Sequence, residues 1–162
     1  MNTSNNTAFW VITGAASGIG AAVVRAARDA GANVLALDVD DDKGLALADE
    51  TGAMYRHCDI SDPGQWQQLV EFLNLAKADV GAPTHIHLNA GIQIAPPHAP
   101  MSDYQLEAVT LERYRRMMSV NVDGVVVGLQ SLLPLLSSGA AIVVTASLAG
   151  VTPYAVDPLY AM

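Results

Sequence analysis

Five short apolar runs alternate with stretches of helical periodicity along this chain, and this alternation limits the fold more than any other feature. The runs are rich in aliphatic and β-branched residues and are bounded by Gly, Asp or Pro. They cover Phe9–Thr13, Asn33–Asp38, Met54–Cys58, His85–Asn89 and Ala140–Thr145. Parallel strands need long crossover connections, which are usually helical. The pattern therefore predicts an α/β fold with a doubly wound parallel sheet covered by helices on both faces.

The helical stretches carry ordinary start and stop signals. Gly31 ends the first, Pro63 opens a later one, and Leu111–Leu136 is the longest, with an end expected near Pro134. The Pro-rich stretch Ala95–Asp103 follows the fourth expected strand and should form an exposed loop. Because ligands bind at the carboxyl edge of such sheets, this loop is a candidate pocket wall.

Composition narrows the class of protein. The 162 residues, 51% of them hydrophobic, suit a single domain over residues 1–162. A formal net charge of −8 argues against nucleic acid as a partner, and the lone Cys58 excludes an intramolecular disulfide framework. The first ten residues lack a signal-peptide pattern, and no window approaches the roughly 20 apolar residues of a membrane span. We therefore expect a cytoplasmic protein with no membrane partner.

Thr13–Gly20 reads TGAASGIG and lies directly between the first expected strand and the first expected helix. We expect Gly14 to permit a tight turn, Gly18 to let the backbone approach a pyrophosphate, and Gly20 to let the helix pack closely on the strand. The N–H groups and partial positive charge at the start of a helix attract an anion. In this strand–turn–helix context the glycines predict a dinucleotide-binding loop.

Asp38 ends the second expected strand, where a carboxylate can accept hydrogen bonds from the adenosine ribose and repels a 2′-phosphate. No Arg or Lys follows before Lys43. The sequence thus favours NAD over NADP. The neighbouring acidic run, Asp40–Asp42, is interpreted as a solvated turn and helix start.

The glycine loop resembles that of the short-chain dehydrogenase/reductase family, in its compact single-domain branch. Further matches follow in order: Asp59–Ile60, the LNAG of Leu88–Gly91, Asn121 in SVNVDG, Ser147 in VTASLAG, and Tyr160. The resemblance implies a Rossmann-like fold. It also implies a set of cofactor-binding residues, namely Thr13, Gly14, Ser17, Gly18, Ile19, Gly20, Asp38, Asp59, Ile60, Asn89, Ala90 and Gly91.

The resemblance further implies hydride transfer between NAD(H) and an alcohol or carbonyl carbon of a small-molecule alcohol or ketone substrate. Tyr160 would be the general acid–base, Ser147 would hydrogen-bond the substrate oxygen, and Asn121 would hold a water in a proton relay. Family members are commonly homodimers or homotetramers that pair through the helix carrying the active-site Asn. The same assembly is expected here.

The chain departs from the family pattern at its end. The active-site Lys, four residues after the tyrosine, and the last strands of the family would fall beyond Met162. We expect a domain truncated after Tyr160, with Ala140–Thr145 left as an exposed sheet edge. A truncated or degenerate dinucleotide-binding protein without turnover is the alternative function. A nucleotide-sugar epimerase is disfavoured, because that branch spaces its glycines differently.

Other polar residues admit simpler interpretations. His85 and His87 share one face of a strand, a spacing that could hold a metal, but two ligands without a third favour core histidines. No metal site is predicted. Arg113, Arg115 and Arg116 are interpreted as a charged helix face, and Cys58 as a small buried residue beside the adenine pocket.

Overall fold

A computed structural model describes residues 7–161 of the chain, and in it five strands form one parallel sheet with the order β3-β2-β1-β4-β5. Each strand lies within its expected range: β1 (Phe9–Thr13), β2 (Asn33–Asp38), β3 (Met54–His57), β4 (His85–Leu88) and β5 (Ala141–Val144). The expected α/β fold with a doubly wound parallel sheet is therefore confirmed.

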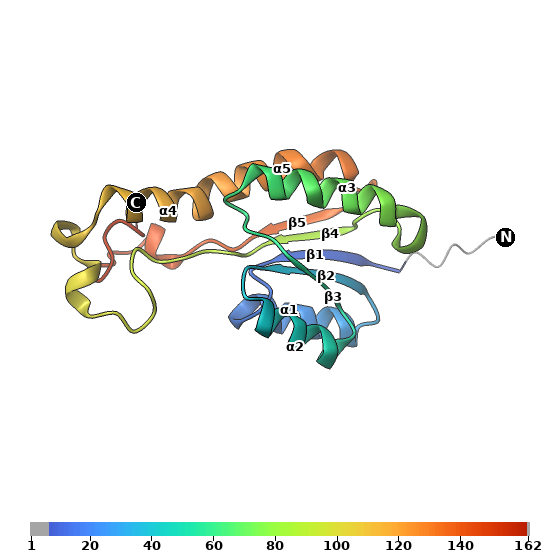
Figure 1. Ribbon diagram of the computed structural model, residues 1–162, viewed down its shortest axis with the longest axis horizontal. Coiled ribbons are helices and arrows are strands. Elements are labelled where there is room, and N and C mark those ends of the chain that lie inside the picture. The colour runs from blue at the N-terminus through green and yellow to red at the C-terminus, as the bar shows by residue number, and fades with distance from the viewer. Residues whose placement is uncertain (1–6, 162) are drawn as a thin grey trace.

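Helices cover both faces of this sheet (Figure 1). One face carries α1 (Gly18–Asp29) and α2 (Asp41–Thr51), and the other carries α3 (Pro63–Val80) and α5 (Gly124–Leu132), while α4 (Leu111–Met118) extends beyond the sheet. Short helical turns complete the chain: η1 (Met101–Tyr104), η2 (Leu106–Ala108), η3 (Ser119–Asp123), η4 (Leu133–Leu135) and η5 (Leu148–Gly150). The element η3 is a single π-helical turn that joins α4 to α5.

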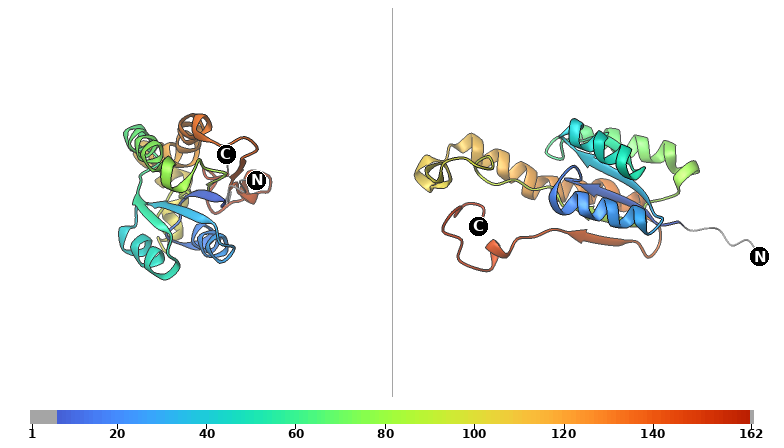
Figure 2. Two further views of the ribbon diagram at one scale, coloured as in Figure 1. Left: turned by 90° about the vertical axis from the view of Figure 1, so that its right-hand side faces the viewer. Right: turned by 90° about the horizontal axis from the view of Figure 1, so that it is seen from below.

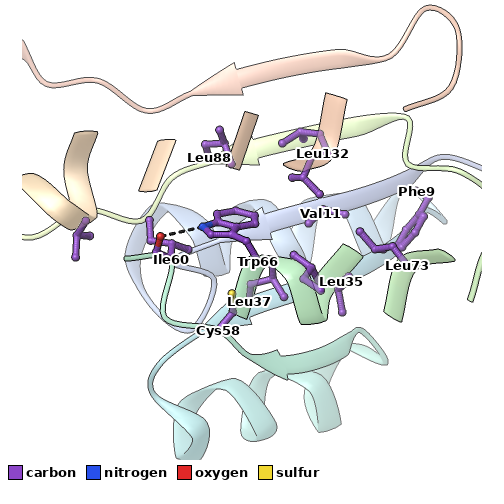
Figure 3. Close-up of a cluster of buried hydrophobic side chains, with 13 residues drawn as sticks. Phe9, Val11, Leu35, Leu37, Cys58, Ile60, Trp66, Leu73, Leu88 and Leu132 are labelled. Carbon is purple, nitrogen blue, oxygen red and sulfur yellow. Dashed lines mark hydrogen bonds between the residues drawn. The ribbon is translucent and has the colours of Figure 1, made fainter. Parts of the chain in front are cut away.

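The larger core cluster lies between the sheet and the α3 and α5 helices, around Trp66 (Figure 3). The Trp66 side chain is fully buried, and its indole Nε1 donates a hydrogen bond of 2.9 Å to the Ile60 carbonyl oxygen. Its ring packs against Gly128 of α5, the glycine that leaves room for it. The opposite face uses smaller side chains, because Ala21, Val24 and Ala27 bring α1 close to the sheet.

The expected long helix is present as one continuous helical path from α4 to η4. By length and composition alone, Leu111–Leu135 is apolar enough to cross a membrane, so the expectation that no stretch qualifies was too strict. Its apolar character also serves packing within the fold. Glycines on α5 contact the core, with Gly124 against Ile60 and Gly128 against Trp66.

Strand β5 lies at the edge of the sheet, and all four of its residues are exposed, as expected from the sequence. The segment after β5 runs on past the sheet and ends near the loop that precedes α4 (Figure 2). There Leu159 and Tyr160 pack against a small cluster of buried side chains, which comprises Ile94, Ala95, Tyr104 and Met117.

Candidate functional site

A cleft opens at the carboxyl ends of β1 and β4, the adjacent strands whose connections leave toward opposite edges of the sheet. In doubly wound folds this switch point is where ligands bind. The cleft has a volume of about 620 Å³. It is lined by every residue predicted for the site except Thr13 and Gly20: Gly14, Ser17, Gly18, Ile19, Asp38, Asp59, Ile60, Asn89, Ala90, Gly91, Asn121, Ser147 and Tyr160.

The glycine loop forms the floor of this cleft between β1 and α1. Gly14 adopts φ +62°, and a Cβ there would lie 2.7 Å from the Ala90 Cα, so both the turn and the close approach require glycine. At Gly20 a Cβ would overlap the Gly14 carbonyl oxygen, which explains why α1 packs so closely on the loop. Neither Thr13 nor Gly20 faces the cleft directly. Both support residues that do: the Thr13 hydroxyl accepts the N–H groups of Asn89 and Ala90, and Gly20 packs against Gly14.

The N-terminus of α1 differs from those of α2, α3 and α4. Those helices are capped by the side chains of Asp40, Asp62 and Thr110, each of which accepts a backbone N–H. At the start of α1, the Ser17 side chain makes no capping hydrogen bond within the part of the chain that the structure describes. The first-turn N–H groups of α1 therefore remain available to an anion at the cleft.

Asp38, at the end of β2, lines the cleft next to the glycine loop. Its Oδ2 accepts a 2.8 Å hydrogen bond from the Ala16 N–H, and its Oδ1 accepts from the N–H groups of Val39 and Asp40. These bonds fix the carboxylate at the end of β2 and tie it to the glycine loop. The nearest following cation, Lys43, pairs with Asp40 instead. Asp40 also caps α2, which confirms the interpretation of Asp40–Asp42 as a helix start.

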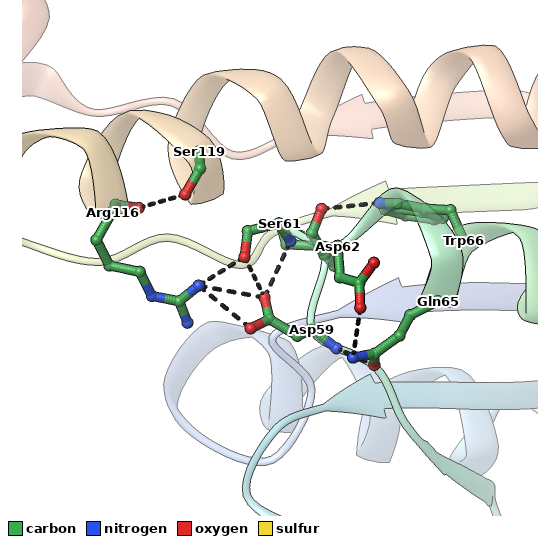
Figure 4. A network of polar contacts seen from close by, with 8 residues as sticks. Asp59, Ser61, Asp62, Gln65, Trp66, Arg116 and Ser119 are labelled. Carbon is green, nitrogen blue, oxygen red and sulfur yellow. Dashed lines mark hydrogen bonds and ion pairs between the residues drawn. The ribbon is translucent and has the colours of Figure 1, made fainter. Parts of the chain in front are cut away.

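At the end of β3, the carboxylate of Asp59 forms a network with Ser61 and Arg116 (Figure 4). The Ser61 hydroxyl donates to Oδ1 at 2.7 Å, and Arg116 Nη1 lies 3.2 Å from Oδ2 and 2.6 Å from the Ser61 oxygen. Burial alone would raise the pKa of the Asp59 carboxyl, but the Ser61 hydrogen bonds and Arg116 outweigh it and lower this pKa. Arg116 also lines the cleft, so it is more than a charged helix face. Its partner lies 57 residues away, and no local pattern indicated the pairing.

Arg113 is likewise held by specific contacts on the Pro-rich side of the cleft. Its Nε donates to the Ile94 carbonyl oxygen at 3.0 Å and its Nη2 to the Asp103 carbonyl oxygen at 2.8 Å. The predicted pocket wall, the loop Ala95–Asp103, contributes to a second cavity of about 770 Å³ between this loop and α4. That cavity adjoins the cleft at Gly91, Ile92, Gln93 and Arg116.

Asn121 lies within the π turn η3, at the junction of α4 and α5. Its side-chain amide contacts the backbone of Ile92, the residue after the Asn-Ala-Gly turn that follows β4. A π turn inside a helix is rare and is frequent at functional sites. The amide is thus occupied in holding the cleft wall, a role the sequence pattern did not reveal.

Ser147 and Tyr160 complete the cleft on the side of β5. The Ser147 hydroxyl accepts a 3.1 Å hydrogen bond from the Ala149 N–H. The Tyr160 segment is fixed by Asp157, a fully buried carboxylate that sequence reasoning missed. Asp157 Oδ1 accepts from the Tyr160 N–H and its Oδ2 from the Ile94 N–H, each at 3.0 Å. Asp157 therefore joins the tyrosine to the opposite wall.

The two strand histidines have separate partners. The His85 ring stacks on Trp10 with ring centroids 4.3 Å apart, and its Nδ1 lies 2.8 Å from the Thr84 hydroxyl oxygen. The Nε2 of His87 lies 2.8 Å from the Thr145 hydroxyl oxygen. No group of three or more His, Cys, Asp or Glu side chains is placed to hold a metal ion among residues 7–161. Cys58 is buried, as interpreted from the sequence, and it lines the cleft beside Asp59.

Comparison with known proteins agrees with this geometry. The family model for short chain dehydrogenases matches residues 8–162. The chain is 34% identical over 146 residues to 2,5-dichloro-2,5-cyclohexadiene-1,4-diol dehydrogenase of Sphingobium indicum, covering 87% of this chain and 54% of that protein. It is 36% identical over 120 residues to tropinone reductase-like 2 of Erythroxylum coca, covering 73% of this chain and 41% of that protein.

Solved structures show the same likeness. A short-chain dehydrogenase/reductase, glucose/ribitol dehydrogenase, from Brucella melitensis superposes with a TM-score of 0.78 at 28% identity, covering 96% of this chain and 63% of that one. The chain spans about half the length of the relatives that it matches in sequence.

Proposed function

Since the chain belongs to the short-chain dehydrogenase family, we propose that its cleft binds NAD(H) and serves hydride transfer between that cofactor and an alcohol or carbonyl carbon. Proteins of this family bind nicotinamide dinucleotides. The observation that carries the proposal is the convergence of three separate sequence features on one cleft: the glycine loop, the carboxylate of Asp38, and the Asn121, Ser147 and Tyr160 group.

The described residues fit two polar groups of the dinucleotide, its pyrophosphate and its adenosine ribose. The uncapped first turn of α1 offers N–H donors and the positive end of a helix dipole, which suit a pyrophosphate. The Asp38 carboxylate, already fixed by three backbone N–H groups, keeps one lone pair, on Oδ2, that can accept a hydroxyl of the adenosine ribose. The same negative charge would repel a 2′-phosphate, which supports NAD over NADP.

The cofactor would supply the hydride chemistry, and the chain would supply orientation and a proton. Tyr160 is proposed as the general acid–base that gives a proton to the carbonyl oxygen or takes one from the hydroxyl. Ser147 is proposed to donate a hydrogen bond to the same substrate oxygen. A free phenol has a pKa near 10, so the phenol needs a nearby positive charge to act at neutral pH. The oxidised nicotinamide ring carries such a charge.

The substrate class follows from the relatives. They include enzymes named as a reductase-like protein and as a diol dehydrogenase, so we propose a small-molecule alcohol or ketone. The second cavity, between the Pro-rich loop and α4, adjoins the cleft and could admit the part of the substrate distant from the reacting carbon.

Cofactor titration tests the first half of the proposal. NADH and NADPH are added separately to the protein, and binding is followed by nicotinamide fluorescence. We expect NADH to bind about tenfold more tightly, and Asp38→Ala to bring the two dissociation constants to within about threefold. Tighter binding of NADPH to the unmodified protein would overturn the choice of cofactor. Failure to bind either would overturn the proposal itself.

Turnover tests the second half. A panel of secondary alcohols is offered with NAD, and NADH formation is compared between the unmodified protein and Tyr160→Phe, which keeps the ring and removes the hydroxyl. NADH formation that is lost in Tyr160→Phe supports the enzyme. NADH binding without any Tyr160-dependent turnover supports the alternative, a dinucleotide-binding protein.

We also propose that the chain forms a homodimer or homotetramer through the helical path that carries Asn121. Val122, Val126 and Leu133 are large apolar side chains on this path and are exposed. Val126→Glu should shift the mass measured by light scattering toward the monomer while the circular dichroism spectrum is kept. A monomeric unmodified protein would contradict the proposal.

A further inference from the structure

A polar pair bridges β4 and the residue that follows β5. His87 lies on β4 with only 5% of its surface exposed, and Thr145 follows β5, with its N–H donating to the Leu88 carbonyl oxygen at 2.9 Å. The His87 Nε2 and the Thr145 hydroxyl lie 2.8 Å apart. A buried imidazole is costly unless its polar atoms are paired, and Thr145 supplies the partner of the His87 Nε2.

The pair continues into the glycine loop through Asn89. The Thr145 hydroxyl donates to Asn89 Oδ1 at 3.0 Å. On its other side, the Asn89 amide Nδ2 donates to the carbonyl oxygens of Thr13 at 3.2 Å and Gly14 at 3.1 Å. Four contacts thus connect His87 to the backbone of the loop that forms the floor of the cleft.

The direction of every hydrogen bond in this series is fixed by chemistry. Carbonyl oxygens only accept, so the Asn89 NH₂ group must face Thr13 and Gly14, and its oxygen must face Thr145. The Thr145 hydroxyl has a single proton, which it gives to that oxygen, and so it must accept from His87. His87 therefore carries its proton on Nε2. Removing the Thr145 hydroxyl takes away one of the three hydrogen bonds that orient the Asn89 amide, and removing His87 takes away the donor that directs the Thr145 proton toward it.

The Asn89 amide matters to the cleft because space around it is tight. A Cβ on Gly20 would come within 2.8 Å of Asn89 Nδ2, so this amide lies against the start of α1 as well as against the loop. The Asn89 and Ala90 N–H groups also donate to the Thr13 hydroxyl, at 3.0 and 3.1 Å. Displacement of the amide would therefore alter the loop on which the pyrophosphate is proposed to rest.

We propose that His87 and Thr145 are positioning residues for the dinucleotide: they hold the Asn89 amide in the one orientation that keeps the Thr13–Gly14 turn shaped for its phosphates. The inference rests on the proposed function of the cleft. His87 does not line the cleft and acts only through Thr145 and Asn89, whereas Thr145 itself lines the cleft. It gives His87 a role that its strand position alone did not explain.

The test is NADH binding to a set of variants, measured by nicotinamide fluorescence, with urea unfolding of each variant as a parallel measurement. Thr145→Val keeps the shape and removes the hydroxyl, and should weaken NADH binding about tenfold. Thr145→Ser keeps the hydroxyl and should bind within about twofold of the unmodified protein. His87→Leu should weaken binding about threefold, and His87→Gln, whose Nε2 can still donate, should restore it.

The double variant His87→Leu with Thr145→Val distinguishes a series of contacts from two separate packing effects. Because His87 acts through Thr145, the double variant should bind NADH no more weakly than Thr145→Val alone. His85→Leu is the matched control, since His85 lies on the same strand, two residues away, and bonds to Thr84 instead. It should leave NADH affinity unchanged even if it lowers stability.

Three results would overturn the inference. They are equal NADH affinity in Thr145→Val and the unmodified protein, multiplicative losses in the double variant, or a loss in His85→Leu as large as that in His87→Leu. If Thr145→Val does not fold, the comparison of His87→Leu with His87→Gln decides alone. Failure of the unmodified protein to bind NADH or NADPH would instead count against the proposed function, so the two failures are distinguishable.

Discussion

The side chain of Asn121 and the backbone of Ile92 form a two-point contact: the Ile92 N–H donates to Asn121 Oδ1, and Asn121 Nδ2 donates to the Ile92 carbonyl oxygen, both at 2.8 Å. The contact joins the π turn between α4 and α5 to the strand-end turn on the other side of the cleft. The contact uses both the oxygen and the nitrogen of the Asn121 amide, and so it fixes Ile92 in the wall of the cleft.

Asn121→Ala should therefore lower both stability and cofactor affinity. Loss of two hydrogen bonds at a partly exposed position should reduce the free energy of unfolding by about 1–2 kcal/mol. NADH affinity should fall because Ile92 and Gly91 line the cleft. Urea unfolding and NADH titration measure the two effects. Asn121→Asp keeps the acceptor and loses the donor, so its free energy of unfolding should lie between those of the unmodified protein and Asn121→Ala. Unchanged stability in Asn121→Ala would show that the contact contributes nothing.

Gly128→Ala should destabilise the contact between α3 and α5. A Cβ at this position would lie 2.8 Å from the Trp66 ring, which is fully buried and tethered through its indole N–H to Ile60. Overpacking of this kind costs about 1–3 kcal/mol. Gly150→Ala is the control, because within the described chain nothing lies within 4 Å of a Cβ there. Equal urea midpoints for the two variants would contradict the packing described for Trp66.

Cys58 should react slowly with thiol reagents in the folded protein. Burial, with a further contribution from Asp59, raises the pKa of the Cys58 thiol to about 11. At pH 8 only about one molecule in a thousand would carry the reactive thiolate. Labelling with a disulfide reagent should speed up about tenfold between pH 8 and pH 9 and much more in urea. Saturating NADH should slow the labelling further, since Cys58 lines the cleft. An equal labelling rate in native and unfolded protein would contradict the burial of the Cys58 thiol.

His87 should make the protein less stable as the pH falls below about 6.5. Burial lowers the pKa of the His87 imidazole in the folded state, whereas the unfolded chain takes up a proton near 6.5. Between the two pKa values the unfolded state binds more protons, so the free energy of unfolding decreases with falling pH, by up to about 1.4 kcal/mol per pH unit. Urea unfolding at pH 7.5 and 5.5 should show a smaller pH effect in His87→Gln. An identical pH effect in both proteins would exclude His87 as its source.

The sequence predicted the features that depend on local pattern. Each strand fell within its apolar run, and the residues at the carboxyl ends of those strands met at one cleft because parallel strands bring such ends together. The glycine loop and Asp38 were found for this reason, whereas Asn121, Ser147 and Tyr160 were identified only through the resemblance to the family. The prediction of a continuous helix over Leu111–Leu136 missed its π turn, where Asn121 contacts Ile92, and the 3₁₀ turn in which it ends.

What the sequence did not predict depends on pairs that are distant along the chain. Arg116 reaches Asp59, Asp157 reaches Ile94, and His87 reaches Thr145, with separations of 57, 63 and 58 residues. Each residue on its own is consistent with an ordinary surface or core position. Only the fold brings the partners together, so their roles could not be read from local spacing.

The uncapped start of α1 has a consequence for folding itself. Where a side chain would normally satisfy the first-turn N–H groups, this helix leaves them to water or to a ligand. A dinucleotide whose phosphates accept those bonds binds the native chain and not the unfolded one, and so shifts the folding equilibrium by mass action. At a concentration a hundredfold above its dissociation constant, this linkage amounts to about 2.7 kcal/mol. If the cleft binds NAD as proposed, the cofactor takes the place of a side-chain cap on the first helix, and cells that are poor in it would hold a measurably less stable protein.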